Sequence, residues 1–132
     1  DVARCAALTE AELSTVLASA DVVRHRNKVW SVRKNAQCTL EVQREFGSLS
    51  NYLWGFVKGV SGPSFRTTSP ESEAMSKDLK KRGFLFVGPT IMYAFMQAMG
   101  LVNDHQHDCH VRPIPRRTQI NNHSLKRQSF AF

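Results

Sequence analysis

The spacing of hydrophobic residues in the first part of the chain predicts two helices joined by a hairpin. Thr9 and Glu12 have the spacing of a capping box, in which each side chain bonds the other residue's backbone amide. A helical apolar stripe follows, breaks over residues 21–28, and then restarts; its members are Leu13, Val16, Leu17 and Ala20, then Val29, Val32, Ala36 and Leu40. We therefore predict a helix from Thr9 to about residue 20, a tight basic hairpin, and a second helix from Val29.

The second half of the chain predicts three more helices. One follows the break at Gly47 and Ser48, and another begins at Ser69 and Pro70, a good N-cap followed by a residue suited to the first turn. The helix that begins at Ser69 is expected to end at Gly83. Its basic residues are expected to face outward or toward a partner: Lys77, Lys80, Lys81 and Arg82. Residues 90–99 are apolar nearly all round, which predicts a central buried helix, and residues 84–87 before it are expected to form a buried connector. The predicted fold class is all-α.

Composition and charge limit the classes of partner. The chain has 132 residues and is 42% hydrophobic, enough for one compact unit, and its net charge of +7 favours nucleic acid. It has no apolar run of about 18 residues and no secretory signal, and its three cysteines are widely spaced, so we expect an intracellular protein without disulfides. Because it starts with Asp1 rather than Met, we expect a processed, partial or truncated product. Residues 1–110 are predicted to form the helical domain and residues 111–132 a flexible, disordered basic tail.

The predicted hairpin is the first candidate site. A helix-hairpin-helix, here over about residues 9–44, presents backbone amides and a helix start to a DNA phosphate without reading sequence. Asp21 and Asn27 occupy the turn positions where this motif usually has glycine, and asparagine tolerates a left-handed conformation better than aspartate does. The alternative to a DNA-binding hairpin is an ordinary basic corner between two helices on a solvated face. We assign His25 no catalytic role. The candidate DNA-binding residues are Val23, Arg24, His25, Arg26, Asn27 and Lys28.

A second candidate site lies near the end of the helical region. His105 and Cys109 stand four residues apart, so on one helical turn they would share a face and reach the same metal ion, with His107 and His110 nearby. Zinc takes four ligands, however, and Cys5 and Cys38 are isolated, so a His-rich helix end with an incidental thiol is the alternative. The chain has no glycine-rich phosphate loop, nucleophile elbow or metal-hydrolase signature. The residues alone predict a basic helical module and no reaction.

Four runs of sequence in the second half resemble a known family. The runs are 76–84 (SKDLKKRGF), 86–91 (FVGPTI), 93–98 (YAFMQA) and 100–105 (GLVNDH), and they closely resemble the C-terminal half of the type I DNA-3-methyladenine glycosylases. Residues 23–28 (VRHRNK) also resemble the helix-hairpin-helix of that family, which usually has glycine at the position of Asn27. The resemblance covers roughly residues 1–110.

The resemblance implies a base-excision repair function on double-stranded DNA with alkylated bases, by a monomer that does not bind membranes. Such enzymes flip the alkylated adenine out of the duplex and hydrolyse its glycosidic bond, without a lysine Schiff base and without cutting the strand. Methylation at N3 already makes the base a good leaving group, so little acid-base machinery is needed. The family also carries a zinc ion, and His105 and Cys109 match two of its four ligands.

The resemblance also implies which parts of the family's machinery lie elsewhere. The family's acidic residue, most of its pocket aromatics and its other two zinc ligands correspond to positions before Asp1. We therefore assign no catalytic residue in this chain, and promoting Glu10, Glu12 or Asp21 to that role would be a mistake. The chain alone is expected to have no excision activity or very weak activity. The alternatives are a non-catalytic DNA-binding module and an inactive fragment.

Overall fold

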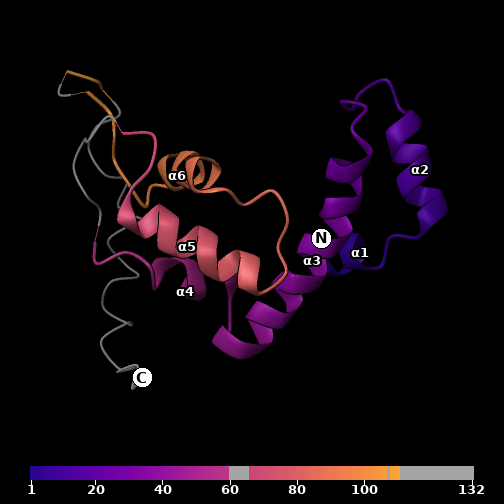
Figure 1. The fold of residues 1–132 in the computed structure, drawn as a ribbon, viewed down its shortest axis with the longest axis horizontal. Helices are drawn as coiled ribbons and strands as arrows, with labels where there is room; N and C mark the ends of the chain where they lie inside the picture. Colours follow the sequence, from indigo (N-terminus) through magenta and orange to yellow (C-terminus); the bar gives the residue numbers. More distant parts are fainter. Residues whose placement is uncertain (60–65, 107, 111–132) are drawn as a thin grey trace.

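The computed structural model describes residues 1–59, 66–106 and 108–110, and these form helices without any strand (Figure 1). The predicted all-α class is confirmed for this part of the chain. The predicted tail, residues 111–132, lies outside the described residues. The helices are α1 (Val2–Ala6), α2 (Glu10–Ala18), α3 (Arg26–Phe46), α4 (Leu49–Trp54), α5 (Pro70–Lys81) and α6 (Pro89–Ala98).

Local capping determines where several helices begin and end. The capping box predicted at Thr9 and Glu12 is formed, and a second one joins Ser69 to Ser72 at the start of α5. Gly47 follows α3 with a φ of 77°, a conformation that costs glycine little and other residues more. Helix α1 was not predicted from the sequence; the Asp1 carboxylate accepts a hydrogen bond from the Arg4 amide at 3.1 Å and caps it.

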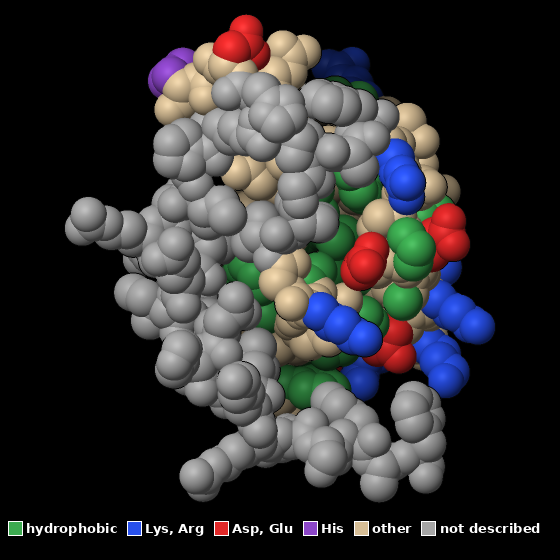
Figure 2. All heavy atoms as spheres, turned by 90° about the vertical axis from the view of Figure 1, so that its left-hand side faces the viewer, with side chains coloured by type: hydrophobic (Ala, Val, Ile, Leu, Met, Phe, Trp, Pro, Cys, Tyr) green, Lys and Arg blue, Asp and Glu red, His purple; other side chains and the backbone are tan. Residues whose placement is uncertain are grey.

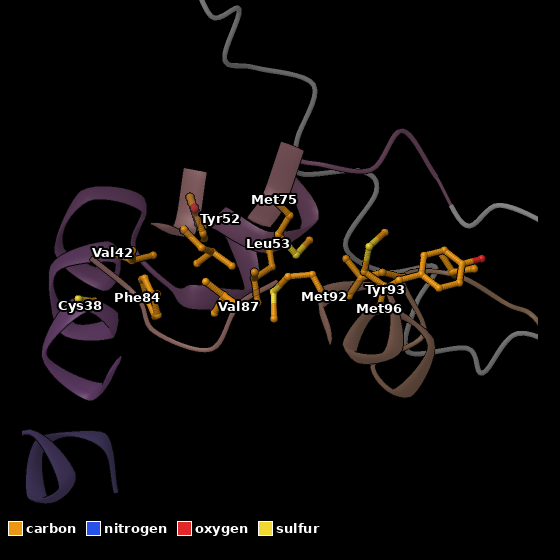
Figure 3. Close-up of a cluster of buried hydrophobic side chains, with 13 residues drawn as sticks. Cys38, Val42, Tyr52, Leu53, Met75, Phe84, Val87, Met92, Tyr93 and Met96 are labelled. Atoms are coloured by element: carbon orange, nitrogen blue, oxygen red, sulfur yellow. The ribbon is translucent and has the colours of Figure 1, made fainter. Parts of the chain in front are cut away.

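The main hydrophobic core lies between the C-terminal half of α3 and helices α4, α5 and α6 (Figure 3). It also receives side chains from the connector before α6 and from the two residues after Gly100. The core residues are Cys38, Val42, Tyr52, Leu53, Met75, Leu79, Phe84, Val87, Met92, Tyr93, Met96, Leu101 and Val102.

Helix α6 is not buried all round, so that prediction was wrong. Met92, Tyr93 and Met96 are buried on one face, whereas Ile91 is 51% exposed and Met99 is 58% exposed. The physical reason is that α6 lies at the outside of the helical body, where α5 covers one of its sides (Figure 1). An apolar sequence therefore marked a helix correctly but overstated its burial.

The connector before α6 is only half buried, which corrects a second prediction. Phe84 and Val87 point into the core, but Leu85 is 46% exposed and Phe86 is 44% exposed. The Asn35 side chain of α3 holds this connector: its Oδ1 accepts from the Leu85 amide at 2.8 Å and its Nδ2 donates to the Leu85 carbonyl at 3.0 Å. The connector is therefore fixed against α3.

The N-terminal half of α3 extends beyond the main core and is covered by α1 and α2 (Figure 1). Leu13 of α2 and Val29 of α3 are buried there. The Glu10 carboxylate accepts from the Trp30 indole at 2.7 Å and pairs with Arg33, which also donates to the Leu8 carbonyl at 3.0 Å. These contacts fix the direction in which the chain enters the hairpin. Over the described ranges, no helix is long and apolar enough to cross a membrane.

Candidate nucleic-acid interface

The hairpin between α2 and α3 is shorter than predicted. Helix α3 begins at Arg26 instead of Val29, so Arg26, Asn27 and Lys28 form its first turn. The cause is His25, whose Nδ1 accepts from the Lys28 amide at 3.3 Å and caps the helix three residues early. Asn27 is helical, so the left-handed turn expected there was wrong.

The hairpin exposes both kinds of phosphate-binding group. Arg24, Arg26 and Lys28 are exposed, and Val23 at the turn is 81% exposed. The backbone amides of Arg26 and Asn27 donate to no acceptor among the described residues, as expected for the first turn of a helix. Such amides carry the positive end of the helix dipole. The six predicted residues 23–28 therefore do come together on one exposed corner with cationic side chains and free donors.

Aromatic rings orient two of the cationic side chains. The Arg26 guanidinium carbon lies 4.1 Å from the centroid of the Trp30 ring, which holds this side chain along the helix. The Lys28 ammonium lies 6.0 Å from the Phe86 ring centroid, and the His25 ring meets Phe86 edge-on at 6.0 Å. Phe86 thus belongs to the same corner as the hairpin. The sequence did not indicate this, because Phe86 comes from a connector nearly sixty residues away along the chain.

The basic face predicted on α5 is confirmed only in part. Lys77, Lys80 and Lys81 are exposed, but Arg82 instead pairs with Glu45 and with Asp78 at 2.9 Å. In Figure 2, which views the molecule from the side away from the hairpin, acidic and basic side chains are interspersed with hydrophobic ones. The charges visible on that side therefore do not form a purely basic surface.

The two predicted metal ligands lie side by side, although not on a helix. Residues 103–106 and 108–110 form turns and extended chain, so the helical turn assumed for this pair is absent there. The Cys109 sulfur nevertheless lies 3.6 Å from Nδ1 of His105. Two ligands of one tetrahedral zinc, at about 2.05 Å for nitrogen and about 2.3 Å for sulfur, would lie about 3.5 Å apart. The separation fits a shared zinc ion, and it equally fits a hydrogen bond between the thiol and the imidazole.

No third ligand joins this pair within the described ranges, where no group of three or more His, Cys, Asp or Glu residues could hold a metal. Cys38 is in the core, where burial raises the pKa of its thiol. The segment that carries the pair is anchored by Asp104, which accepts from the Tyr93 hydroxyl at 2.6 Å and from the Gln97 amide at 2.8 Å. His107 lies outside the described residues.

Several carboxylates are held in structural contacts. Hydrogen bonds from Arg33 and Trp30 lower the pKa of Glu10, and those from Thr9 and Arg4 lower the pKa of Glu12. A general acid requires the opposite, a pKa raised toward the working pH. These two carboxylates are therefore poor proton donors, consistent with assigning neither a catalytic role.

The fold places this chain among a group of solved DNA-repair proteins. It superimposes on a crystal structure of a 3-methyladenine DNA glycosylase I with a TM-score of 0.80 and 38% identity, covering 86% of this chain and 66% of that one. A second match, with a TM-score of 0.81 and 29% identity, is the Staphylococcus aureus 3-methyladenine DNA glycosylase I, whose structure concerns the recognition of 3-methyladenine. It covers 86% of this chain and 64% of that one.

The sequence defines the family more closely. The family model for methyladenine glycosylase matches residues 1–112, so this chain belongs to the methyladenine glycosylase family. Its relatives include the DNA-3-methyladenine glycosylase of Haemophilus influenzae, 39% identical over 116 residues that cover 83% of this chain. The chain spans 63% of that relative's length.

Proposed function

We propose that this chain forms the DNA-binding part of a monofunctional base-excision repair glycosylase that hydrolyses the N-glycosidic bond of 3-methyladenine in alkylated double-stranded DNA. The observation that carries the proposal is the corner formed by the hairpin, which presents Arg24, Arg26, Lys28 and the first amides of α3 in a chain of this family. Phosphate is the anion that such a corner fits, because oriented amides and cations act together on it.

Residues 23–28 would hold one DNA strand through its backbone. Contacts to phosphate carry no base information, so binding should be independent of sequence. Each cation that neutralises a phosphate contributes about 0.9 to the slope of log K against log salt concentration. The salt slope is therefore a direct readout of how many hairpin cations reach the DNA.

The test of DNA binding is fluorescence anisotropy with a labelled duplex over a series of salt concentrations. Arg24→Ala and Lys28→Ala should each weaken binding and lower the slope by about 0.9. Lys81→Ala, an exposed cation on α5, is the matched control and should leave the slope unchanged. Equal losses from all three substitutions would mean that general positive charge, rather than the hairpin, binds the duplex.

The test of catalysis is chromatographic detection of free 3-methyladenine released from an alkylated duplex. We expect no release or very weak release by this chain, because no catalytic residue is assigned in it and Glu10 and Glu12 are held in structural contacts. The alternative is a non-catalytic DNA-binding module, which is favoured by the same observation and predicts duplex binding with no release. Robust release of the methylated base by this chain would contradict both expectations.

Zinc is part of the proposal as a structural ion. His105 and Cys109 would supply two ligands, since their 3.6 Å separation fits one tetrahedral ion, and two more ligands would come from outside the described residues. Zinc has no redox chemistry of its own and would tie this segment to another part of the protein. The tether from Asp104 to Tyr93 and Gln97 would keep the two ligands close to α6.

A further inference from the structure

One residue of the connector before α6 has a backbone conformation that is unusual for its type of side chain. Phe86 has a φ of 58°, in the left-handed region, and it is the single non-glycine residue with a positive φ in the described part of the chain. A bulky aromatic residue rarely adopts this conformation, and glycine or asparagine is usual there. Phe86 is 44% exposed, whereas Phe84 and Val87 of the same connector are buried in the core.

The position of this ring is fixed from α3. Asn35 binds both backbone groups of Leu85, and it lies seven residues after Lys28, which is two helical turns and therefore the same face of α3. The connector is thus laid along the face that starts at the hairpin. At that end the Phe86 ring contacts His25 edge-on and Lys28 through its ammonium group, each at 6.0 Å.

We infer that Phe86 is a DNA-contacting residue whose ring packs against a deoxyribose beside the phosphate bound by Lys28, an inference that rests on the proposed function of the hairpin. A DNA strand alternates anionic phosphates with largely apolar sugars. The corner offers the complementary pair, an exposed ring next to a cation and free helix amides. The charge of the corner selects DNA, because the Lys28 ammonium lies 6.0 Å from the ring centroid and Arg24 and Arg26 are exposed on the same hairpin.

Two variants separate this ring from its surroundings. Phe86→Asn removes the ring but keeps a residue that tolerates a positive φ, so the chain should still fold. Leu85→Ala is the matched control: Leu85 is exposed to nearly the same degree, at 46%, but has no aromatic ring to pack against a sugar. Thermal unfolding of each variant would verify that the helices remain.

The experiment is the anisotropy titration of the 132-residue chain with a labelled duplex at several salt concentrations. Phe86→Asn should weaken binding about tenfold, and Leu85→Ala by less than about twofold. Because a sugar contact releases no counterions, the salt slope of Phe86→Asn should equal that of the unmodified chain. Lys28→Ala should lower it by about 0.9.

Each other outcome has a definite meaning. If Phe86→Asn binds as tightly as the unmodified chain while Lys28→Ala binds more weakly, the inference fails and the proposed function stands. A lower salt slope for Phe86→Asn would mean that the ring merely positions Lys28, which also overturns a direct contact. If the unmodified chain forms a dimer that Phe86→Asn abolishes, the ring serves a second copy instead of DNA. Absence of salt-sensitive binding by the unmodified chain would overturn both proposals.

Discussion

The hydroxyl of Tyr52 offers a sharp test of how the helical body is held together. Tyr52 in α4 is only 4% exposed, and its hydroxyl donates to Oδ2 of Asp78 in α5 at 2.7 Å. Nε of Arg82 donates to the same oxygen at 2.9 Å. Burial and the bond to Asp78 raise the pKa of Tyr52, so its hydroxyl stays a neutral donor at every pH of interest. Tyr52→Phe removes this one donor.

The expected loss follows from what the substitution leaves in place. The ring keeps its contacts with Phe46 and Phe56, at centroid distances of 5.0 and 5.2 Å, so the main loss is one hydrogen bond to a charged acceptor. Such a bond contributes about 1.5–3 kcal/mol, and because Arg82 still pairs with Asp78 we expect the lower end, about 1.5 kcal/mol. For a chain of this size, about 4 °C per kcal/mol gives a fall in Tm of about 6 °C.

The effect should depend on pH in a defined direction. Burial alone would raise the pKa of Asp78, but the hydrogen bonds from Tyr52 and Arg82 outweigh it and lower that pKa. A carboxyl group with a lowered folded pKa stabilises the fold above its unfolded pKa, about 3.9, and this stability is lost as pH falls through the folded pKa. The difference between Tyr52→Phe and the unmodified chain should therefore be largest near neutral pH and shrink below about pH 4.

The assay is thermal unfolding followed by circular dichroism, at neutral and acidic pH. Asp78→Ala provides the second half of a double-mutant cycle, since Tyr52→Phe should cost much less once its acceptor is gone. Lys77→Ala, an exposed position on α5, serves as a control and should melt with the unmodified chain. A Tm of Tyr52→Phe within about 1 °C of the unmodified chain at neutral pH, or an equal loss in the Asp78→Ala background, would refute the reasoning.

Three further predictions address a cap, a turn and the metal pair. Thr9→Ala removes the capping box with Glu12 and should cost about 1 kcal/mol, seen as a fall in Tm of about 4 °C; an unchanged Tm would mean that α2 does not depend on its cap. Gly83→Ala places a Cβ at a φ of 89° and should destabilise the chain by about 1 kcal/mol in urea unfolding, whereas a stabilised variant would show that the turn is not strained. Since His105 and Cys109 supply only two of four ligands, the purified chain should bind added zinc weakly; a zinc titration should show still weaker binding by Cys109→Ser, and equal affinity of both chains would place the metal elsewhere.

Patterns local in sequence predicted most of the helices. The capping box at Thr9, the proline start at Pro70 and the glycine stop at Gly83 depend on neighbouring residues alone, so the starts of α2 and α5 could be read directly. The beginning of α3 could not, because histidine is not among the usual N-caps and nothing in the pattern marks His25 as one. The prediction therefore placed Arg26 and Lys28 in a loop instead of on a helix.

The features missed at the candidate site depend on contacts between distant parts of the chain. Whether Arg82 faces a partner or an internal carboxylate depends on Glu45, which a second helix brings to it. The same is true of Phe86, whose place beside His25 follows from the bond between Asn35 and Leu85. The six hairpin residues, 23–28, could be chosen because they are contiguous, and their proposed role in DNA binding remains the prediction that the salt slope tests.

Helix α3 also has a consequence for how the molecule opens in solution. It is one continuous helix of 21 residues, about 30 Å long, but its two halves are covered by different partners. Around Val42 the amides are surrounded by the main core, and they should exchange with deuterium only when the whole body unfolds. Around Val29 they are covered mainly by the short helices α1 and α2, so a local opening that releases these two helices would expose them. The amides in the two halves of α3 should therefore differ in their protection from exchange, and the corner proposed to bind DNA lies in the less protected half.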